Sequence, residues 1–346
     1  MKRVGNLYEK VVTKENIKRA IFEVYKSKSS KVKSKYKKYV GNADFYASKL
    51  MNNFHINGNY EVKIKVDSNS GKSRELQIPK FYPDQIIQHA LTQITLPYIM
   101  KKITRECCCS IKERGTLYAS KLVRKSLKKK KVKYYAQFDI KKYFPSIDRE
   151  ILLNQLKDIF KDQKIIDCYR EIIFSVDSGL PIGNYTSQHL SNLYLTPLDR
   201  FIKQDLHIKY YSRYADDFII LGANKRELKR VIPLIVKYLL DNLKLEIHED
   251  IEIYSIYEKP IDFAGYKHFK KHITIRKRNW KKTRRMLIRA NTFKRSKRLM
   301  AYLGYIKHSN SRNILKRYIL KIKNARTLIR KEVLKNGNIS NINYGI

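Results

Sequence analysis

The sequence IKYYSRYADDFIIL, residues 208–221, decides the fold. Two runs rich in β-branched and aromatic residues, Ile208 to Tyr214 and Phe218 to Leu221, flank Ala215-Asp216-Asp217. Such runs on either side of a short turn predict a β-hairpin with two adjacent carboxylates at its tip. Acidic hairpin tips are common on protein surfaces, so this pair indicates a functional site only together with motifs elsewhere in the chain.

A second short strand carries a third carboxylate. Tyr134 to Ile140 is an aromatic and apolar run that suits a buried strand, and Asp139 lies near its end. An unpaired charge is costly to bury, and the adjacent Asp216 and Asp217 repel each other. A cation among the three side chains would resolve both problems. Two Mg²⁺ ions held by carboxylates of neighbouring strands are also the usual apparatus for in-line phosphoryl transfer.

The composition indicates a polyanionic partner. The chain has 346 residues, with 75 Lys and Arg against 31 Asp and Glu, which gives a formal net charge of +44. Nucleic acid is the leading partner for such an excess. Hydrophobic residues make up 43% and aromatic residues 12%, which excludes a disordered basic tail. Four cysteines without zinc-finger spacing, no signal peptide and no apolar run near ~18 residues predict a soluble cytoplasmic protein without a zinc site.

Periodicity predicts the elements that precede the central strand. Residues 1–60 favour helices, except for the Lys- and Ser-rich segment from Lys26 to Lys38, which is expected to be a loop. Residues 60–79 predict a hairpin, and a helix is expected from Pro83 onward. After the central strand, Asp148 is a plausible N-cap for another helix.

The C-terminal part changes character. Strand-like runs occur at Leu245 to Ile253 and Ile261 to Phe269. Residues 276–331 then hold 21 Lys and Arg and no Asp or Glu, with aromatic residues interleaved at helical spacing. This composition suits a helical clamp on a phosphate backbone. A further basic run at 121–133 is as compatible with a solvated helix face as with a nucleic-acid contact.

Five motifs occur in an order that is highly specific. Together they resemble the fingers motif and the A, B, C and E motifs of reverse transcriptases, and the likeness covers roughly residues 60–335. The five motifs are GKSRELQIP at 71–79, FDIKKYF at 138–144, GLPIGNYTSQ at 179–188, YADD at 214–217 and FAGY at 263–266.

The resemblance implies an α+β fold, a right-hand polymerase with fingers, a palm sheet and a helical thumb. The domains it implies are an N-terminal region with fingers at 1–133, a palm at 134–275 with finger elements near 160–185, a basic thumb at 276–335 and a tail at 336–346. No protease, RNase H or endonuclease segment fits in the remaining residues.

The resemblance also assigns the reacting centre. The three aspartates match the catalytic metal ligands of the family, which hold two Mg²⁺ ions for which Mn²⁺ can substitute. The carbonyl of Ile140 matches a further oxygen ligand. Phe144, five residues past Asp139, lies where the family has an aromatic steric gate against a ribose 2′-hydroxyl. The expected product is therefore DNA, made from deoxynucleoside triphosphates on an RNA template.

Two further sets of residues are implied to hold nucleotide and nucleic acid. Lys72 and Arg74 match finger residues that grip the incoming triphosphate, and Gly183 would let the backbone approach the base pair closely. The nucleotide-binding set comprises Lys72, Arg74, Phe144, Ile182, Gly183 and Gln188. The primer and template grip comprises Phe263, Gly265, Tyr266, Lys281, Lys282, Arg284 and Arg285.

The second motif suggests a subfamily. It ends in Ser187-Gln188, whereas retron and group II intron enzymes usually have Ser-Pro there, and this form resembles diversity-generating retroelement enzymes. That likeness implies a structured template RNA, frequent errors opposite adenine and a small basic accessory protein. Ile182 stands where accurate enzymes commonly have Gln, so a hydrogen bond near the nascent pair is missing.

Two alternative functions are compatible with parts of the sequence. An antiphage-defence reverse transcriptase that copies a dedicated noncoding RNA is the main alternative, and a variable-protein gene with a near-identical repeat nearby would favour the diversity-generating type. A non-catalytic RNA-binding protein is disfavoured by the intact aspartate set. One departure from the family concerns the expected general acid after the hairpin, for which Lys244 and His248 are weak matches.

Overall fold

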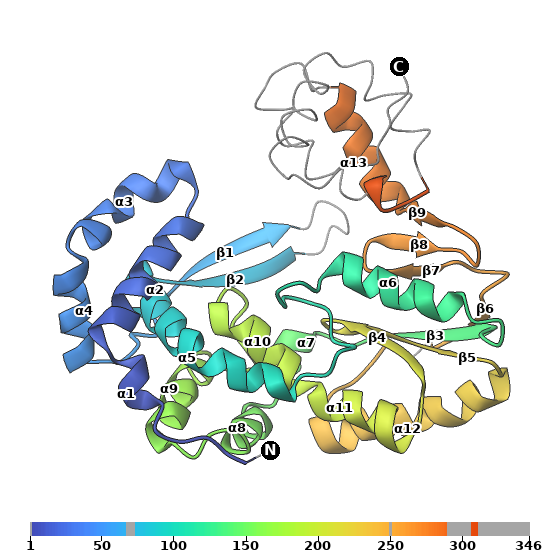
Figure 1. Cartoon of the computed structure of the whole chain (residues 1–346), viewed down its shortest axis with the longest axis horizontal. Coiled ribbons are helices and arrows are strands. Elements are labelled where there is room, and N and C mark those ends of the chain that lie inside the picture. Colours follow the sequence, from blue (N-terminus) through green and yellow to red (C-terminus); the bar gives the residue numbers. More distant parts are fainter. Residues whose placement is uncertain (1, 67–72, 249–250, 289–305, 311–346) are drawn as a thin grey trace.

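The computed structural model describes residues 2–66, 73–248, 251–288 and 306–310. Figure 1 shows three regions: N-terminal helices beside a long hairpin, a central sheet between helices, and a small sheet from which helix α13 rises. This mixture of helices and antiparallel sheets confirms the predicted α+β class. None of the helices in the described ranges is both long and apolar enough to cross a bilayer.

The N-terminal part is helical, with α1 (Tyr8–Val11), α2 (Lys14–Ser27), α3 (Ser30–Gly41) and α4 (Ala43–Asn52). The prediction of a loop from Lys26 to Lys38 is wrong, because most of this segment forms α3. Tyr36 of α3 stacks on Phe81 with ring centroids 4.4 Å apart, and Tyr39 stacks on Tyr82 at 5.6 Å. These distant contacts stabilise a helix that the local sequence does not favour.

The predicted hairpin and the helix after it are both confirmed. Strands β1 (Tyr60–Val66) and β2 (Ser73–Pro79) pair antiparallel, with their turn outside the described residues. A short helical turn, η1 (Phe81–Gln85), leads into α5 (Ile86–Lys102), which packs against α2. Helix α5 therefore packs against α1 and α2, and α3 and α4 pack against α2.

The central sheet has the strand order β4-β5-β3-β6. Its strands are β3 (Tyr134–Asp139), β4 (Tyr210–Tyr214), β5 (Asp217–Gly222) and β6 (Ile253–Ser255). Strands β4 and β5 form the predicted hairpin around Ala215 and Asp216. The predicted strand at 245–253 is only partly present: Ile247 forms an isolated bridge with Ile140, and β6 begins at Ile253.

The two faces of the central sheet pack against different helices, as Figure 1 shows. Phe138 and Phe218 stack on each other at 4.6 Å in the larger core, which helices after the motif-B segment cover. Tyr135 and Ile219 face α6 (Thr116–Leu127) in a smaller core. The helices on the larger-core side are α10 (Tyr185–Tyr194), α11 (Thr196–Arg200), η2 (Phe201–Asp205) and α12 (Lys225–Leu243).

Three helices connect the central strand to the second motif, namely α7 (Tyr143–Ser146), α8 (Arg149–Lys157) and α9 (Gln163–Ile173). Asp148 is the predicted N-cap of α8, because its side chain accepts a hydrogen bond from the Ile151 main-chain nitrogen at 2.9 Å. This prediction is confirmed. The basic run at 121–133 lies partly on α6, where its charged side chains are exposed, which leaves both readings of that run open.

The third sheet consists of β7 (Ile261–Phe263), β8 (Tyr266–His268) and β9 (Ile273–Ile275), followed by α13 (Lys277–Ile288). The single strand predicted at 261–269 is wrong, because the chain reverses at Ala264 and Gly265, whose φ angles are +49° and +87°. Most of the predicted thumb after α13 and the whole tail at 336–346 lie outside the described residues. The domain boundaries therefore remain predictions.

Candidate active site

The three predicted aspartates meet at one end of the central sheet. Asp139 ends β3 and lies directly opposite Asp217, the first residue of β5. Asp216 lies in the two-residue turn between β4 and β5, next to Asp217. Pairing of the two strands therefore brings together carboxylates that are 77 residues apart in the chain, from Asp139 to Asp216.

The clustered negative charges of the three carboxylates would be stabilised by a bound cation. Burial raises the pKa of the Asp216 carboxyl, and the negative charge of Asp139 adds to the effect. Burial also raises the pKa of Asp217 to about 7, with Asp139 and Asp216 contributing in the same direction. Charge repulsion of this kind disappears when a divalent cation lies between the carboxylates.

The backbone of Ile140 provides one more oxygen on the same side. The main-chain groups of Asp139 and Lys141 bond to residues 246–248, with Lys141 N donating to Glu246 O at 2.9 Å and His248 N to Asp139 O at 3.1 Å. Since adjacent residues of a strand direct their main-chain groups to opposite sides, the Ile140 carbonyl faces the side of β5. This orientation fits its predicted role as a ligand.

The donor set fits a hard divalent cation, because three carboxylates and a carbonyl are the oxygen ligands that Mg²⁺ and Mn²⁺ accept. Asp139, Asp216, Asp217 and the Ile140 carbonyl would hold such ions. Within the described part of the chain, no three acidic, His or Cys side chains already stand in coordinating positions. The Asp139 side chain is 59% exposed, so it is free to turn toward the other two. His248 Nε2 lies 3.8 Å from Asp139 Oδ2.

A buried ion pair holds the turn that carries Asp216. The Arg213 guanidinium donates to both carboxylate oxygens of Asp199 at 2.7 Å, and both side chains are fully buried. Arg213 Nη1 also donates to the main-chain oxygen of Ala215 at 3.1 Å, and Ala215 has a φ of +58°. The network thus supports a left-handed residue beside Asp216. Neither residue of this pair was predicted from the sequence to belong to the site.

The fingers hairpin reaches the carboxylates through Arg74. This residue lies exposed on β2, and its positive charge opposes the rise in the pKa of Asp216. Arg74 is therefore close enough for its charge to act on Asp216, and its contact with a triphosphate stays a prediction. Lys72, the other predicted triphosphate ligand, lies outside the described residues.

Phe144, the predicted steric gate, lies on α7, five residues after Asp139. Its ring is half-buried on α7 and meets Tyr143 edge-on, with centroids 5.6 Å apart. The Phe144 main-chain oxygen accepts a hydrogen bond from Leu180 at 2.9 Å. Gly179, with a φ of +61°, has no room for a Cβ, which would lie 2.2 Å from that same oxygen. Motif B, at Gly179 and Leu180, therefore contacts the last residue of motif A, Phe144.

The remaining motif-B residues contact the fingers hairpin. Ile182 accepts a hydrogen bond from the Gln77 main-chain nitrogen at 2.8 Å. A Cβ on Gly183 would lie 2.4 Å from the Gln77 oxygen, so the close approach at this glycine is to β2. The predicted approach to a base pair is untested. Ile182 is half-buried and Gln188 is exposed.

The predicted primer and template grip divides into two groups. Phe263 and Tyr266 are buried, so their side chains support the hairpin from within rather than reach a nucleic acid. Gly265 forms the turn and accepts a hydrogen bond from Asn279 of α13 at 3.3 Å. On α13, the side chains of Lys281, Lys282, Arg284 and Arg285 are exposed.

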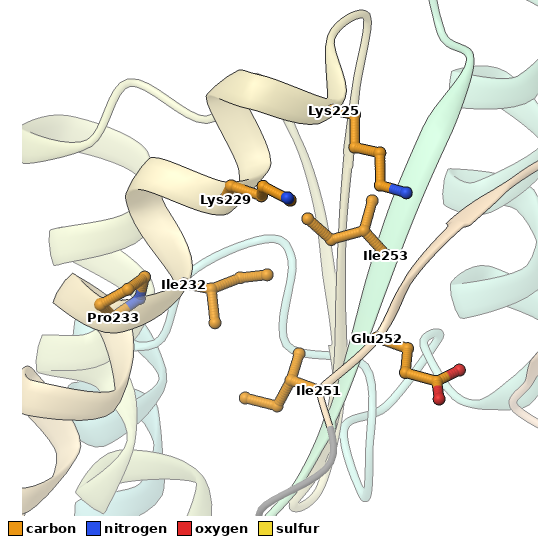
Figure 2. A pocket seen from close by; sticks show the side chains of 7 residues that line it. All are labelled: Lys225, Lys229, Ile232, Pro233, Ile251, Glu252 and Ile253. Carbon is orange, nitrogen blue, oxygen red and sulfur yellow. The ribbon is translucent and has the colours of Figure 1, made fainter.

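Two surface grooves lie on the palm. One is lined by Gln137, Asp262, Lys267, Arg276, Lys277 and Arg278, and it borders the aspartates because Gln137 contacts Asp217. Figure 2 shows the other groove, between α12, which supplies Lys225 and Lys229, and the segment Ile251 to Ile253. No predicted site residue lines this second groove. Only the first groove belongs to the candidate site.

Known sequences resemble this chain over its central part. A family model described as reverse transcriptase (RNA-dependent DNA polymerase) matches residues 72–268. The retron Ec73 reverse transcriptase of Escherichia coli is 32% identical over 136 residues, which is 36% of this chain and 40% of that protein. The group II intron-encoded protein LtrA of Lactococcus lactis subsp. cremoris is 23% identical over 271 residues, or 57% and 45%. The chain thus spans less than half the length of these relatives.

Solved structures share the fold. Telomerase from Candida tropicalis in complex with a TWJ fragment of telomeric RNA matches with a TM-score of 0.51 and 14% identity, over 85% of this chain and 61% of that one. Telomerase from Candida albicans with the same kind of fragment gives 0.51 and 12%, over 80% and 59%. These matches confirm the predicted right-hand polymerase fold. Because the family model spans more than half of the sequence, the chain belongs to the reverse transcriptase (RNA-dependent DNA polymerase) family.

Proposed function

We propose that this protein is an RNA-directed DNA polymerase. The observation that carries the proposal is the meeting of Asp139, Asp216 and Asp217 at one end of the central sheet, with the Arg74 charge beside them. A protein that only bound RNA would need the basic surface but not three carboxylates gathered at one end of a sheet, two of which have a raised pKa because they are buried near Asp139. Template RNA, cDNA and deoxynucleoside triphosphates are the partners this function requires.

Each part of the site has one task in this proposal. Two bound Mg²⁺ ions would activate the primer 3′-hydroxyl and offset the charge that develops on the triphosphate. Arg74 would orient the triphosphate, and Phe144 would exclude a ribose 2′-hydroxyl. The exposed basic side chains of α13 would hold the backbone of the template–primer duplex.

Primer extension tests the proposal directly. The purified chain is given an RNA template with an annealed DNA primer, Mg²⁺ and the four deoxynucleoside triphosphates, and the products are resolved by length. We expect template-dependent extension that EDTA stops. Failure to extend with both Mg²⁺ and Mn²⁺, by protein that still binds the duplex, would contradict the proposal.

Replacing Phe144 with Ala is expected to admit ribonucleotides. Loss of the ring removes a steric barrier worth about 1–3 kcal/mol, so the preference for deoxynucleotides should fall about 10–100-fold. The measurement compares kcat/KM for each nucleotide type in single-nucleotide extension. Phe144→Tyr keeps the ring and serves as the control. If Phe144→Ala discriminates as well as the parent, the ring is core packing and not a gate.

The source of the template has two candidates. The Ser187-Gln188 ending and the apolar Ile182 support a diversity-generating retroelement enzyme, which would act with a small basic accessory protein. The similarity to a retron reverse transcriptase supports the alternative, a defence enzyme that copies a dedicated noncoding RNA. The two candidates differ in the accuracy that they require.

Fidelity separates these candidates. Without a hydrogen bond from Ile182, base selection rests on shape and pairing, so errors should be frequent and concentrated opposite template adenine. Ile182→Gln should reduce them by about 2–10-fold, the value of one added hydrogen bond. Deep sequencing of cDNA from one defined RNA provides the measurement, with Ile182→Leu as the apolar control. Accurate copying of adenine by the parent would favour the defence alternative.

A further inference from the structure

Gln137 links a catalytic carboxylate to the small sheet that precedes α13. Its Nε2 donates to Asp217 Oδ1 at 2.9 Å and to the main-chain oxygen of Asp262 at 3.2 Å. Both neighbours are acceptors, which fixes the orientation of the amide. Gln137 lies on the same face of β3 as Asp139, two residues away, so its side chain stands beside the aspartates.

Arg276 reaches the same carbonyl from the other side. Its Nη2 donates to the Asp262 main-chain oxygen at 3.1 Å, and its Nε donates to the Asp262 carboxylate. Arg276 is the residue immediately before α13. Its charge also opposes the rise in the pKa of Asp217. The side chains of Gln137 and Arg276 therefore both donate to one main-chain oxygen, and Gln137 also bonds to Asp217.

The free edge of β7 explains why these bonds form. Among the described residues, strand β7 pairs with β8 alone, so the main-chain oxygens on its other side need donors from elsewhere. Tyr135 Oη donates to Pro260 O at 3.3 Å, and Gln137 donates to Asp262 O two residues later. Tyr135 and Gln137 thus fasten the same edge, but of the two only Gln137 bonds to Asp217.

We propose that Gln137 is a positioning residue for Asp217, and that Gln137, the Asp262 carbonyl and Arg276 form a link that fixes this carboxylate relative to the first turn of α13. The inference rests on the proposed polymerase function and deepens it. A nucleic acid bound along α13 would then be held at a set distance from the reacting centre. Loss of the amide leaves the Asp217 carboxylate without its donor and free to turn away.

The test compares Gln137→Met with the parent. Methionine keeps the length of the side chain but has no donor. We expect kcat and the Mn²⁺ affinity to fall about 10–100-fold, the usual cost of removing a partner that orients a metal ligand. The Kd for the RNA–DNA duplex, measured without metal, and the KM for nucleotide should stay within about twofold, because the exposed residues of α13 are unchanged.

Tyr135→Phe is the matched control, because it removes a bond to the same strand edge without touching Asp217. Its kcat and its Mn²⁺ affinity, which is measured by electron paramagnetic resonance, should equal those of the parent. Equal losses in Tyr135→Phe and Gln137→Met would mean that both residues only dock β7. Parent-like metal affinity in Gln137→Met would also overturn the proposal.

Arg276→Gln provides a second route if Gln137→Met is unstable. Because both side chains act through the Asp262 carbonyl, the double variant should lose less activity than the product of the two single losses. If the loss of activity in the double variant equals the product of the two single losses, Gln137 and Arg276 act independently and do not form one link. If the parent makes no DNA at all, the polymerase proposal fails, while the Mn²⁺ titration still tests the position of Asp217.

Discussion

Asp216→Asn is expected to reduce Mg²⁺-dependent DNA synthesis by about 10³-fold or more, because the reaction depends on charge at this position. Asparagine has the size of aspartate, but it removes the negative charge with which Asp216 would help Asp139 and Asp217 to hold a cation. Binding of the RNA–DNA duplex should change little, since the exposed basic residues of α13 are retained. Single-turnover primer extension and a duplex-binding titration measure the two effects separately.

A matched control makes the same chemical change elsewhere. Asp241 is exposed near the end of α12, so Asp241→Asn alters the net charge equally without touching the central sheet. It should extend primers at the parental rate. Synthesis by Asp216→Asn within about tenfold of the parent would remove Asp216 from the metal site, since a metal ligand carries more than that.

Local sequence patterns were sufficient to predict the catalytic hairpin. The runs of β-branched and aromatic residues within 208–221 and the apolar run that carries Asp139 are properties of adjacent residues, and strand formation depends on such patterns. The order of five motifs then supplied the right-hand fold, which the family match and the telomerase structures confirm. The functional roles assigned to individual residues stay predictions.

The failures have a common physical cause, because each depends on contacts between distant segments. Helix α3 was missed because its stability comes from stacking of Tyr36 on Phe81, 45 residues later. The burial of Phe263 in a core formed with α6 was likewise not predicted, and its role at the primer stays a prediction. Nothing near these residues in the sequence indicates either partner.

Gln137 and Arg213 show a signal that was present but not used. Each is a long polar side chain within a strand that is mostly aromatic and apolar. A buried polar group of this kind requires a hydrogen-bonding partner. The sequence could therefore have predicted that both side chains form hydrogen bonds within the fold. That Asp199 is the partner of Arg213 could be seen only in the structure.

Asp199→Ala is expected to lower the free energy of unfolding by about 3–5 kcal/mol, because it leaves the fully buried Arg213 charge without a counter-charge. Tyr211 Oη, which donates to Asp199 at 2.6 Å, also loses its acceptor. Denaturant unfolding measures the change. The control is Asp44→Ala, which breaks surface pairs with Lys14 and Lys18 at a side chain that is 64% exposed and should change the free energy of unfolding far less.

A double replacement separates stability from activity. Asp199→Leu combined with Arg213→Met exchanges the buried pair for apolar side chains, which should restore most of the lost stability. The Ala215 carbonyl would still lack the donor that Arg213 supplies, so the turn that carries Asp216 would stay loose. We therefore expect a stable protein with reduced DNA synthesis. If the double variant recovers both its stability and its rate of DNA synthesis, the ion pair only stabilises the core. If Asp199→Ala is as stable as the parent, the buried charge pair itself is contradicted.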